Sequence, residues 1–278
     1  MILVTGATGN VGAELVRALV DAGEEVRALI RSDGAESQLP AGVDGFVGDL
    51  GRPETVAPGL EGVRAAHLLS GYARHARATG RNPSRRVERV TLQSSSAVPG
   101  GDMGNAVVRY HILSEKAVRE SGVAWMFLQP NSFMSNTLEW VPQLRDGDVV
   151  RAPFPDVRVA TIDPHDVAAV AAEALLSGDH DGRTYRLSGP ESLLPADRVA
   201  ILGRVLGREL RFEGQSNEET RATMSDRMPA AYVDAFFSFF VDGTLDESEV
   251  LPTVEQVTGR APRTFEQWAH SHAEQFAT

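Results

Sequence analysis

Three glycines, Gly6, Gly9 and Gly12, stand at equal spacing between a short apolar run and an apolar pattern of helical period. Residues 2–4 form the apolar run, and the helical pattern reaches Gly23 through Val11, Leu15, Ala18, Leu19 and Ala22. In such a strand–turn–helix unit, the glycines permit a tight turn, a close approach of pyrophosphate and close packing of the helix. Free amides at the helix N-terminus then attract the phosphates. The pattern predicts a Rossmann-type βαβ unit that binds a dinucleotide through Gly6, Thr8, Gly9, Asn10, Val11 and Gly12.

The residues after the second predicted strand indicate which dinucleotide is bound. An acidic residue normally takes the ribose 2′-hydroxyl of NAD at this position, but this chain has Arg31 and Ser32 there. A guanidinium pairs well with a 2′-phosphate through charge-assisted, often bidentate hydrogen bonds. The alternative is an ordinary surface arginine at a strand end. We therefore favour NADP(H) over NAD(H), with contacts from both residues.

Further apolar runs predict the rest of the sheet. They cover residues 25–30, 45–47, 65–70, 90–94 and 125–128, with a helix over residues 107–120 that Gly122 ends. Because crossovers between parallel strands are right-handed, these segments predict an α/β fold with a doubly wound parallel sheet. Ligands bind such sheets at the carboxyl ends of the strands, so we expect cofactor contacts from Asp49, Leu50, Leu69, Ser70 and Gly71. Asp49 is a candidate acceptor for the adenine amino group, although a plain turn explains it nearly as well.

The pattern changes along the second half of the chain. An Ala-rich helix at residues 166–176 and a short strand at residues 184–187 are the last βα signals. Helices and turns follow Pro195, with a cluster of phenylalanines at 236, 237, 239 and 240 and a final helix that carries Trp268. We predict a Rossmann domain over residues 1–150, with a sheet contribution from about residues 157–189. A smaller, mainly helical substrate lobe is expected over residues 190–278.

Composition restricts the partners. The 278 residues include no cysteine and carry a formal charge of −11, which excludes disulfides and thiolate metal sites and disfavours nucleic acid as a partner. One basic stretch lacks the interleaved aromatic residues that would stack on bases, so it is interpreted as a solvated face: Arg74, His75, Arg77, Arg81, Arg85, Arg86 and Arg89. No apolar run is long enough for a membrane span. We expect a cytoplasmic monomer or homodimer that binds a small apolar or aromatic substrate.

Longer segments resemble the NmrA-like group of atypical short-chain dehydrogenases/reductases over most of the chain. The matching segments are TGATGNVG at 5–12, GDL at 48–50, HILSEKAVRESGVAW at 111–125, QPNSFMSN at 129–136, DPHDVAAVAAEAL at 163–175, YRLSGPE at 185–191 and TGRAPRTFEQWAHSHAEQF at 258–276. The group includes NADP-dependent quinone and azo-compound reductases and also redox-sensing regulators without catalysis. The resemblance therefore implies NAD(P) binding and leaves two kinds of function open.

The resemblance also implies candidate catalytic residues. The wider superfamily carries a Tyr-x-x-x-Lys pair on the helix after the fifth strand, and these positions fall on Val107 and His111. The usual acid is therefore missing, and Tyr110 lies about 100° away from His111 around the helix. His111 could bind the ribose or give a proton, because imidazole titrates near neutral pH, but a structural histidine explains it equally well. Ser94, at the end of the fifth strand, could orient substrate, and a loop of small polar residues is its alternative.

The segment after the sixth strand is expected to wall the nicotinamide end. The group's Arg-Pro pair is Gln129-Pro130 here, so an expected positive charge is absent. We expect cofactor contacts from Pro130, Asn131 and Phe133. Phe133 and Met134 would offer an apolar surface to a flat ligand, and core packing explains these two side chains equally well.

A group of polar residues at 163–166 has the spacing of a metal site. Asp163, His165 and Asp166 nevertheless fit better as the N-terminal cap of the following helix, with Pro164 in its first turn. We therefore expect no metal ion.

Two hypotheses follow. The first is an NADPH-dependent reductase that transfers hydride to a quinone, an enone or a similar small, flat electrophile, with protonation from His111, a serine hydroxyl or water. A quinone accepts hydride without a strong protein acid, which suits the missing tyrosine. The second is a non-catalytic regulatory protein that senses NADP(H).

Overall fold

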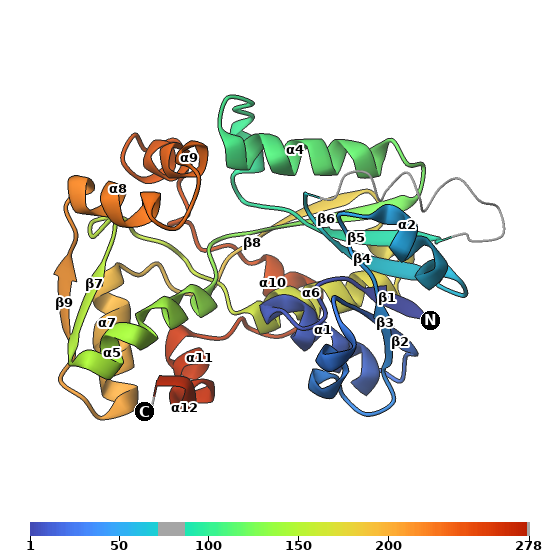
Figure 1. Cartoon of the computed structure of the whole chain (residues 1–278), viewed down its shortest axis with the longest axis horizontal. Helices are drawn as coiled ribbons and strands as arrows, with labels where there is room; N and C mark the ends of the chain where they lie inside the picture. Colours follow the sequence, from blue (N-terminus) through green and yellow to red (C-terminus); the bar gives the residue numbers. More distant parts are fainter. Residues whose placement is uncertain (72–86, 277–278) are drawn as a thin grey trace.

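The computed structural model describes residues 1–71 and 87–276. Within these residues, seven parallel strands form one sheet in the order β3-β2-β1-β4-β5-β6-β8 (Figure 1). The strands are β1 (Ile2–Val4), β2 (Val26–Ile30), β3 (Asp44–Val47), β4 (Ala65–Leu69), β5 (Arg89–Gln93), β6 (Ala124–Pro130) and β8 (Arg183–Leu187). The strand order reverses between β1 and β4, where a doubly wound sheet binds its ligand. The predicted fold class is confirmed.

The predicted strands are all present, with ends that differ by one or two residues. The clearest difference is in β6, which continues through Gln129 and Pro130 because these residues pair in register with Arg186 and Leu187 of β8. Apolar periodicity did not indicate this extension, since neither residue of the pair continues an apolar run.

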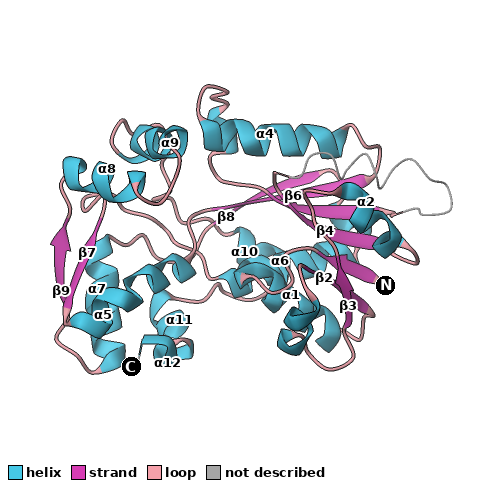
Figure 2. Cartoon of the chain, viewed as in Figure 1, coloured by secondary structure: helices cyan, strands magenta, loops and turns pink. Residues whose placement is uncertain are grey.

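Helices cover both faces of the sheet (Figure 2). The α-helices are α1 (Asn10–Asp21), α2 (Pro53–Val56), α4 (Ala106–Arg119), α5 (Val141–Asp146), α6 (Pro164–Leu176), α7 (Pro195–Leu206), α8 (Asn217–Ser225), α9 (Ala230–Phe240), α10 (Thr253–Thr258), α11 (Phe265–Ser271) and α12 (Ala273–Phe276). Short 3₁₀ turns are η1 (Asp33–Gln38), η2 (Ala57–Leu60), η3 (Val98–Gly100), η4 (Met134–Trp140) and η5 (Gly178–His180). No helix in the described residues is long and apolar enough to cross a bilayer.

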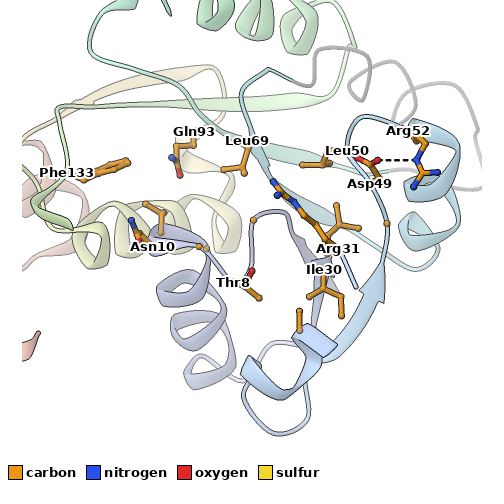
Figure 3. A pocket seen from close by; sticks show the side chains of 17 residues that line it. Thr8, Asn10, Ile30, Arg31, Asp49, Leu50, Arg52, Leu69, Gln93 and Phe133 are labelled. Carbon is orange, nitrogen blue, oxygen red and sulfur yellow. Dashed lines mark hydrogen bonds and ion pairs between the residues drawn. The ribbon is translucent and has the colours of Figure 1, made fainter. Parts of the chain in front are cut away.

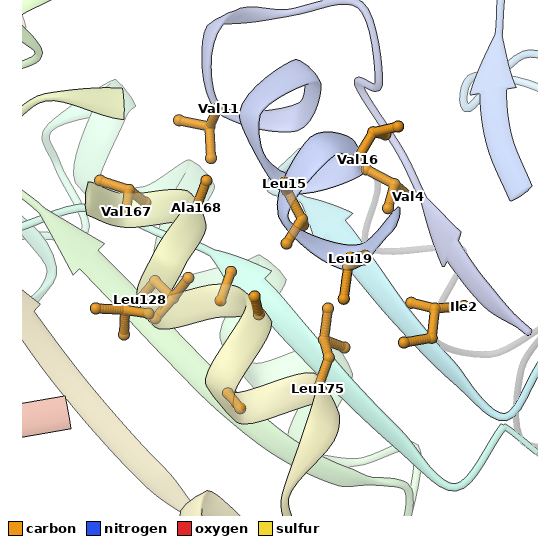
Figure 4. Close-up of a cluster of buried hydrophobic side chains, with 14 of the residues drawn as sticks. Ile2, Val4, Val11, Leu15, Val16, Leu19, Leu128, Val167, Ala168 and Leu175 are labelled. Carbon is orange, nitrogen blue, oxygen red and sulfur yellow. The ribbon is translucent and has the colours of Figure 1, made fainter. Parts of the chain in front are cut away.

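Two apolar cores hold these layers together. On one face, α1 and α6 pack on the sheet through Leu15, Leu19, Val167 and Leu175 (Figure 4). On the other face, α2 and α4 contribute Val56 and Val118 to a cluster with Leu68, Leu92 and Phe127. Each fully buried side chain of this size contributes roughly 1.5–3 kcal/mol relative to exposure. This packing fixes the start of α1 against the carboxyl edge of the sheet.

The C-terminal part of the chain is mainly helical but also contains a small sheet, and the sequence pattern indicated neither of its two strands. β9 (Arg211–Gly214) pairs in parallel with β7 (Val149–Ala152), so the expected boundary at residue 150 lies inside β7. β9 has the sequence Arg-Phe-Glu-Gly, and most of its residues are exposed. Such a short strand shows no apolar alternation from which it could be predicted. Residues from η4, α5 and β7 share a core with α7 and α11. The division into two domains stays a prediction.

Candidate functional site

The turn between β1 and α1 requires glycine at two positions. Gly6 has a φ of 65°, and a Cβ there would lie 2.7 Å from Cδ1 of Leu69. A Cβ on Gly12 would lie 2.0 Å from the carbonyl oxygen of Gly6. Side chains at these positions would therefore strain the turn or collide with it. The tight turn and close helix packing that the spacing predicts are present.

The N-terminus of α1 is arranged to receive an anion. Gly9 caps the helix without a side-chain hydrogen bond, and no acidic residue lies in the first turn. Amides at a helix N-terminus, together with the helix dipole, favour a phosphate group. The Asn10 side chain instead donates to Oγ of Ser135 at 2.9 Å, which joins this turn to the segment after β6.

A cleft of about 790 Å³ lies beside this turn at the carboxyl edge of the sheet (Figure 3). Most of the predicted cofactor contacts line it: Gly6, Thr8, Gly9, Asn10, Val11, Gly12, Arg31, Asp49, Leu50, Leu69 and Phe133. The predicted contacts outside its lining are Ser32, Ser70, Gly71, His111, Pro130 and Asn131. Sequence reasoning missed Leu29, Ile30, Ala35, Gly48, Arg52 and Gln93. Of these, Gln93 ends β5, so the rule that ligands bind at strand ends could have indicated it.

Two arginines and a carboxylate lie at one end of the cleft. The Arg31 side chain extends into the cleft (Figure 3). The Arg52 guanidinium lies 3.1 Å from the Asp49 carboxylate, which also accepts from the amide of Gly51 at 2.8 Å. The Gly51 amide and then Arg52 lower the pKa of Asp49, with a smaller effect of Arg31. Asp49 is thus an ionised group with partners in its own turn, which supports the plain-turn alternative more than adenine recognition.

The residues at the end of β4 either line the cleft or lie next to its lining. Leu69 lines the cleft, whereas the Ser70 hydroxyl donates to the carbonyl of Gln93 at 2.7 Å. Gly71 has a φ of 94°, and a Cβ there would lie 2.2 Å from the Tyr110 hydroxyl. That hydroxyl donates to the carbonyl of Ser70 at 2.6 Å. Tyr110 therefore fixes the end of β4.

Burial changes the acid–base behaviour expected of His111. Loss of solvent lowers its pKa to about 4, so the imidazole is neutral at pH 7. This corrects the expectation that His111 titrates near neutral pH. Its Nδ1 is buried and has no hydrogen-bond partner among the described residues. Because such an atom costs about 1–3 kcal/mol, a ligand hydroxyl or carbonyl beside it would recover free energy.

Ser94 belongs to a buried hydrogen-bond network. Its hydroxyl donates to Oε1 of Glu115 at 2.7 Å, and Nε2 of Gln129 donates to the same oxygen at 2.8 Å. Arg119 lies 3.1 Å from the other Glu115 oxygen. The only hydroxyl proton of Ser94 is thus held by Glu115, which favours the structural interpretation of this serine. Arg119 also provides Glu115 with a positive charge, while Gln129 contributes a neutral amide.

Val107 occupies the position of the missing tyrosine, and its surroundings are apolar. Val107 packs in a cluster between α4 and α9. Its other members are Ala97, Val108, Ile112, Phe236, Phe239, Phe240 and Leu245. Phe154 extends the aromatic surface, with ring centroids 5.7 Å from Phe237 and 5.0 Å from Phe240. This part of the molecule offers aromatic contacts and no phenol at position 107.

Phe133 lines the cleft far from Arg52 (Figure 3). It also packs against the core that α1 and α6 share, so both explanations stay open for this residue. Met134 is 1% exposed and packs in the core of the C-terminal part, which supports core packing for Met134. The buried amide of Asn131 donates to the carbonyls of Ala160 at 3.3 Å and Glu247 at 3.0 Å.

The polar group at residues 163–166 is a helix cap, as predicted. The Asp163 carboxylate accepts from the amide of His165 at 2.9 Å, and Asp166 accepts from the amide of Arg263 at 2.7 Å. Among the described side chains, no group of three or more His, Asp or Glu residues could hold a metal ion. Most of the basic stretch at residues 74–89 lies outside the described residues; Arg89 itself is 3.4 Å from Asp181.

These features together fit a bound dinucleotide. The glycine turn leaves room for a pyrophosphate, α1 presents its amides and Arg31 lies in the cleft. Residues 6–177 match a protein family described as NAD(P)H-binding. The chain belongs to this family, within the NmrA-like atypical short-chain dehydrogenases/reductases. NAD(P)H binding is thereby confirmed.

Two relatives that are reductases confirm the oxidoreductase class, and a solved structure has the same fold. The chain is 40% identical over 287 residues to the (4-alkanoyl-5-oxo-2,5-dihydrofuran-3-yl)methyl phosphate reductase of Streptomyces griseus, covering 100% of this chain and 99% of the relative. It is 33% identical over 285 residues to the NAD(P)H azoreductase of Xenophilus azovorans, covering 99% of each. An NADPH complex of an Escherichia coli quinone oxidoreductase has the same fold, with a TM-score of 0.79, 21% identity, and 99% and 100% of the two chains covered.

Proposed function

We propose that this oxidoreductase uses NADPH to reduce a quinone, an enone or a similar small, flat electrophile. The proposal is carried by the observation that Arg31, the N-terminus of α1 and Phe133 line the same cleft. A dinucleotide laid along it would place its 2′-phosphate at Arg31 and its nicotinamide towards Phe133. The names of the similar proteins describe reduction of a dihydrofuran derivative, azo compounds and a quinone, which are all flat acceptors.

The chain's own residues would hold the reactants. The amides at the start of α1 bind the pyrophosphate, and Arg31 binds the 2′-phosphate. His111 lies outside the cleft lining, so its buried Nδ1 would reach the ribose or the substrate carbonyl only after the side chain turns towards the cleft. When bound, the nicotinamide supplies the hydride. Because His111 is neutral and the Ser94 proton is held by Glu115, water is the proton source that the site favours. Quinones and similar acceptors suit this arrangement.

A steady-state assay tests the proposal. Purified protein would be supplied with NADPH or NADH and with a panel of quinones, enones and azo dyes, while oxidation of the cofactor is followed by absorbance. We expect turnover with at least one acceptor class and a higher kcat/KM with NADPH than with NADH. Tight binding of NADPH without oxidation by any acceptor class would contradict the proposal and favour the sensing function.

A further inference from the structure

Glu247 is a buried carboxylate that lies outside every sequence motif considered above. Glu247 is 4% exposed, and within the described residues its carboxylate accepts three hydrogen bonds. The Ser96 hydroxyl donates to Oε1 at 2.6 Å, the Ser132 amide donates to Oε1 at 3.1 Å and the Ser132 hydroxyl donates to Oε2 at 2.6 Å. Both oxygens are therefore held by neutral donors.

These contacts join three parts of the chain that are distant in sequence. Glu247 lies between α9 and α10, Ser96 follows β5 and Ser132 follows β6. The backbone carbonyl of Glu247 accepts from the side-chain amide of Asn131 at 3.0 Å and from the backbone amide of Ala160 at 2.7 Å. A single residue of the C-terminal segment thus fastens the loops that follow two neighbouring strands.

The desolvation cost of the Glu247 carboxylate argues against a role in filling space alone. A buried carboxylate loses its hydration, and here desolvation raises the pKa of Glu247, while the serine hydrogen bonds and the charge of Arg186 act in the opposite direction. An apolar side chain could fill the same space without this cost. What the carboxylate adds is orientation, because it holds both the amide and the hydroxyl of Ser132 directly before Phe133.

We propose that Glu247 is a positioning residue that sets the Ser132–Phe133 segment as the wall for the nicotinamide half of the cofactor. The inference rests on the proposed placement of the dinucleotide along the cleft. Among the described residues, Glu247 forms no hydrogen bond with the glycine turn or with Arg31, so we expect its effect at the Phe133 end.

The test compares two ligands that differ in this half. NADP⁺ reaches both ends of the cleft, whereas adenosine 2′,5′-bisphosphate lacks the nicotinamide. In Glu247→Gln, we expect the affinity for NADP⁺ to fall roughly tenfold, as for a lost charge-assisted hydrogen bond, while the affinity for the bisphosphate stays within twofold. Glu249→Gln is the matched control, because Glu249 is an exposed neighbour that pairs only with Arg186 at 3.4 Å in the described residues.

A second variant protects the test from a folding defect. Ser132→Ala removes one donor to the carboxylate and should lower the affinity for NADP⁺ selectively, by a smaller factor. Thermal unfolding measured by circular dichroism reports whether each variant folds. If Glu247→Gln does not fold, the affinities of Ser132→Ala test the inference instead. Equal losses for both ligands, or no loss for either, would overturn the inference.

The same variants separate this inference from the proposed function. Absence of turnover by the wild-type protein would contradict the reductase proposal, but the ratio of the two affinities would still test Glu247. With turnover, Glu247→Gln should lower kcat at saturating NADPH, and Glu249→Gln should leave it unchanged.

Discussion

The two ends of the cleft are built in different ways. At one end, Arg31, Asp49 and Arg52 lie on exposed turns, and the Arg52 and Asp49 side chains are 68% and 51% exposed. At the other end, Phe133 is carried by a segment whose neighbours Asn131 and Glu247 are 2% and 4% exposed and form hydrogen bonds across the fold. Exposed charges can select a ligand at little cost to stability, whereas a buried network fixes geometry. We therefore predict that the first end determines which cofactor binds and that the second end positions the reacting groups.

The turn between the two ends should give the largest effect. Gly12→Ala places a Cβ 2.0 Å from the Gly6 carbonyl oxygen, so the turn or the helix start must move. We expect NADP⁺ affinity to fall by roughly a hundredfold or more, because the pyrophosphate amides lose their arrangement. Calorimetric titration measures this change. Gly100→Ala is the control, since a Cβ there meets nothing within 4 Å; equal affinity of the two variants would show that the turn does not bind the cofactor.

The exposed end should determine the preference between cofactors. Arg31→Ala is expected to weaken NADPH binding roughly tenfold or more through loss of a charge-assisted contact, while NADH binding stays unchanged. The loss should shrink as salt is added, because the site is exposed to solvent. Arg17→Ala, on the exposed face of α1, provides the matched control. A parallel loss for NADPH and NADH would remove the case for a 2′-phosphate site.

Burial of His111 predicts how stability depends on pH. Its pKa is lowered from 6.5 to about 4, so the unfolded state binds the proton more readily than the folded state between these values. The stabilising contribution is complete above pH 6.5 and is lost as the pH falls towards 4. Urea unfolding of wild type and His111→Gln from pH 7 to 4.5 should show the wild type losing more stability on acidification. Parallel pH curves for the two proteins would mean that His111 is not desolvated. Burial also lowers the pKa of His67, but this histidine is present in both proteins, so its effect cancels in the comparison.

The smallest effect is expected at the contact between α1 and α6. Glu14 lies 3.3 Å from His165, and this hydrogen bond, followed by Arg17, lowers its pKa to about 2 against the opposing effect of burial. Since the folded pKa is lowered, the carboxylate stabilises the protein above pH 4.5 and loses this effect as the pH falls towards 2. Because the pair is partly exposed, Glu14→Gln should cost about 1 kcal/mol or less at pH 7. A urea midpoint that is equal to wild type at pH 7 and remains so at every pH would argue against the contact.

The sequence predicts the exposed end and the turn well, and the buried end poorly. Gly6, Gly12 and Arg31 belong to one βαβ unit, so spacing within that unit is enough to place them. Glu247 and Ser96 are 151 residues apart, and their contact depends on how the C-terminal segment returns to the sheet. No local pattern records that return. The pKa of His111 was missed for the same reason, because burial is a property of the packed molecule.

We infer that the cleft binds a dinucleotide with its 2′-phosphate at Arg31. Calorimetric titration of the wild-type protein with NADP⁺ and with NAD⁺ under the same salt and pH tests it most directly. We expect both to bind, with NADP⁺ binding roughly tenfold or more tightly. Equal affinities would contradict the role of Arg31, and the absence of binding heat with either would contradict the cofactor site itself.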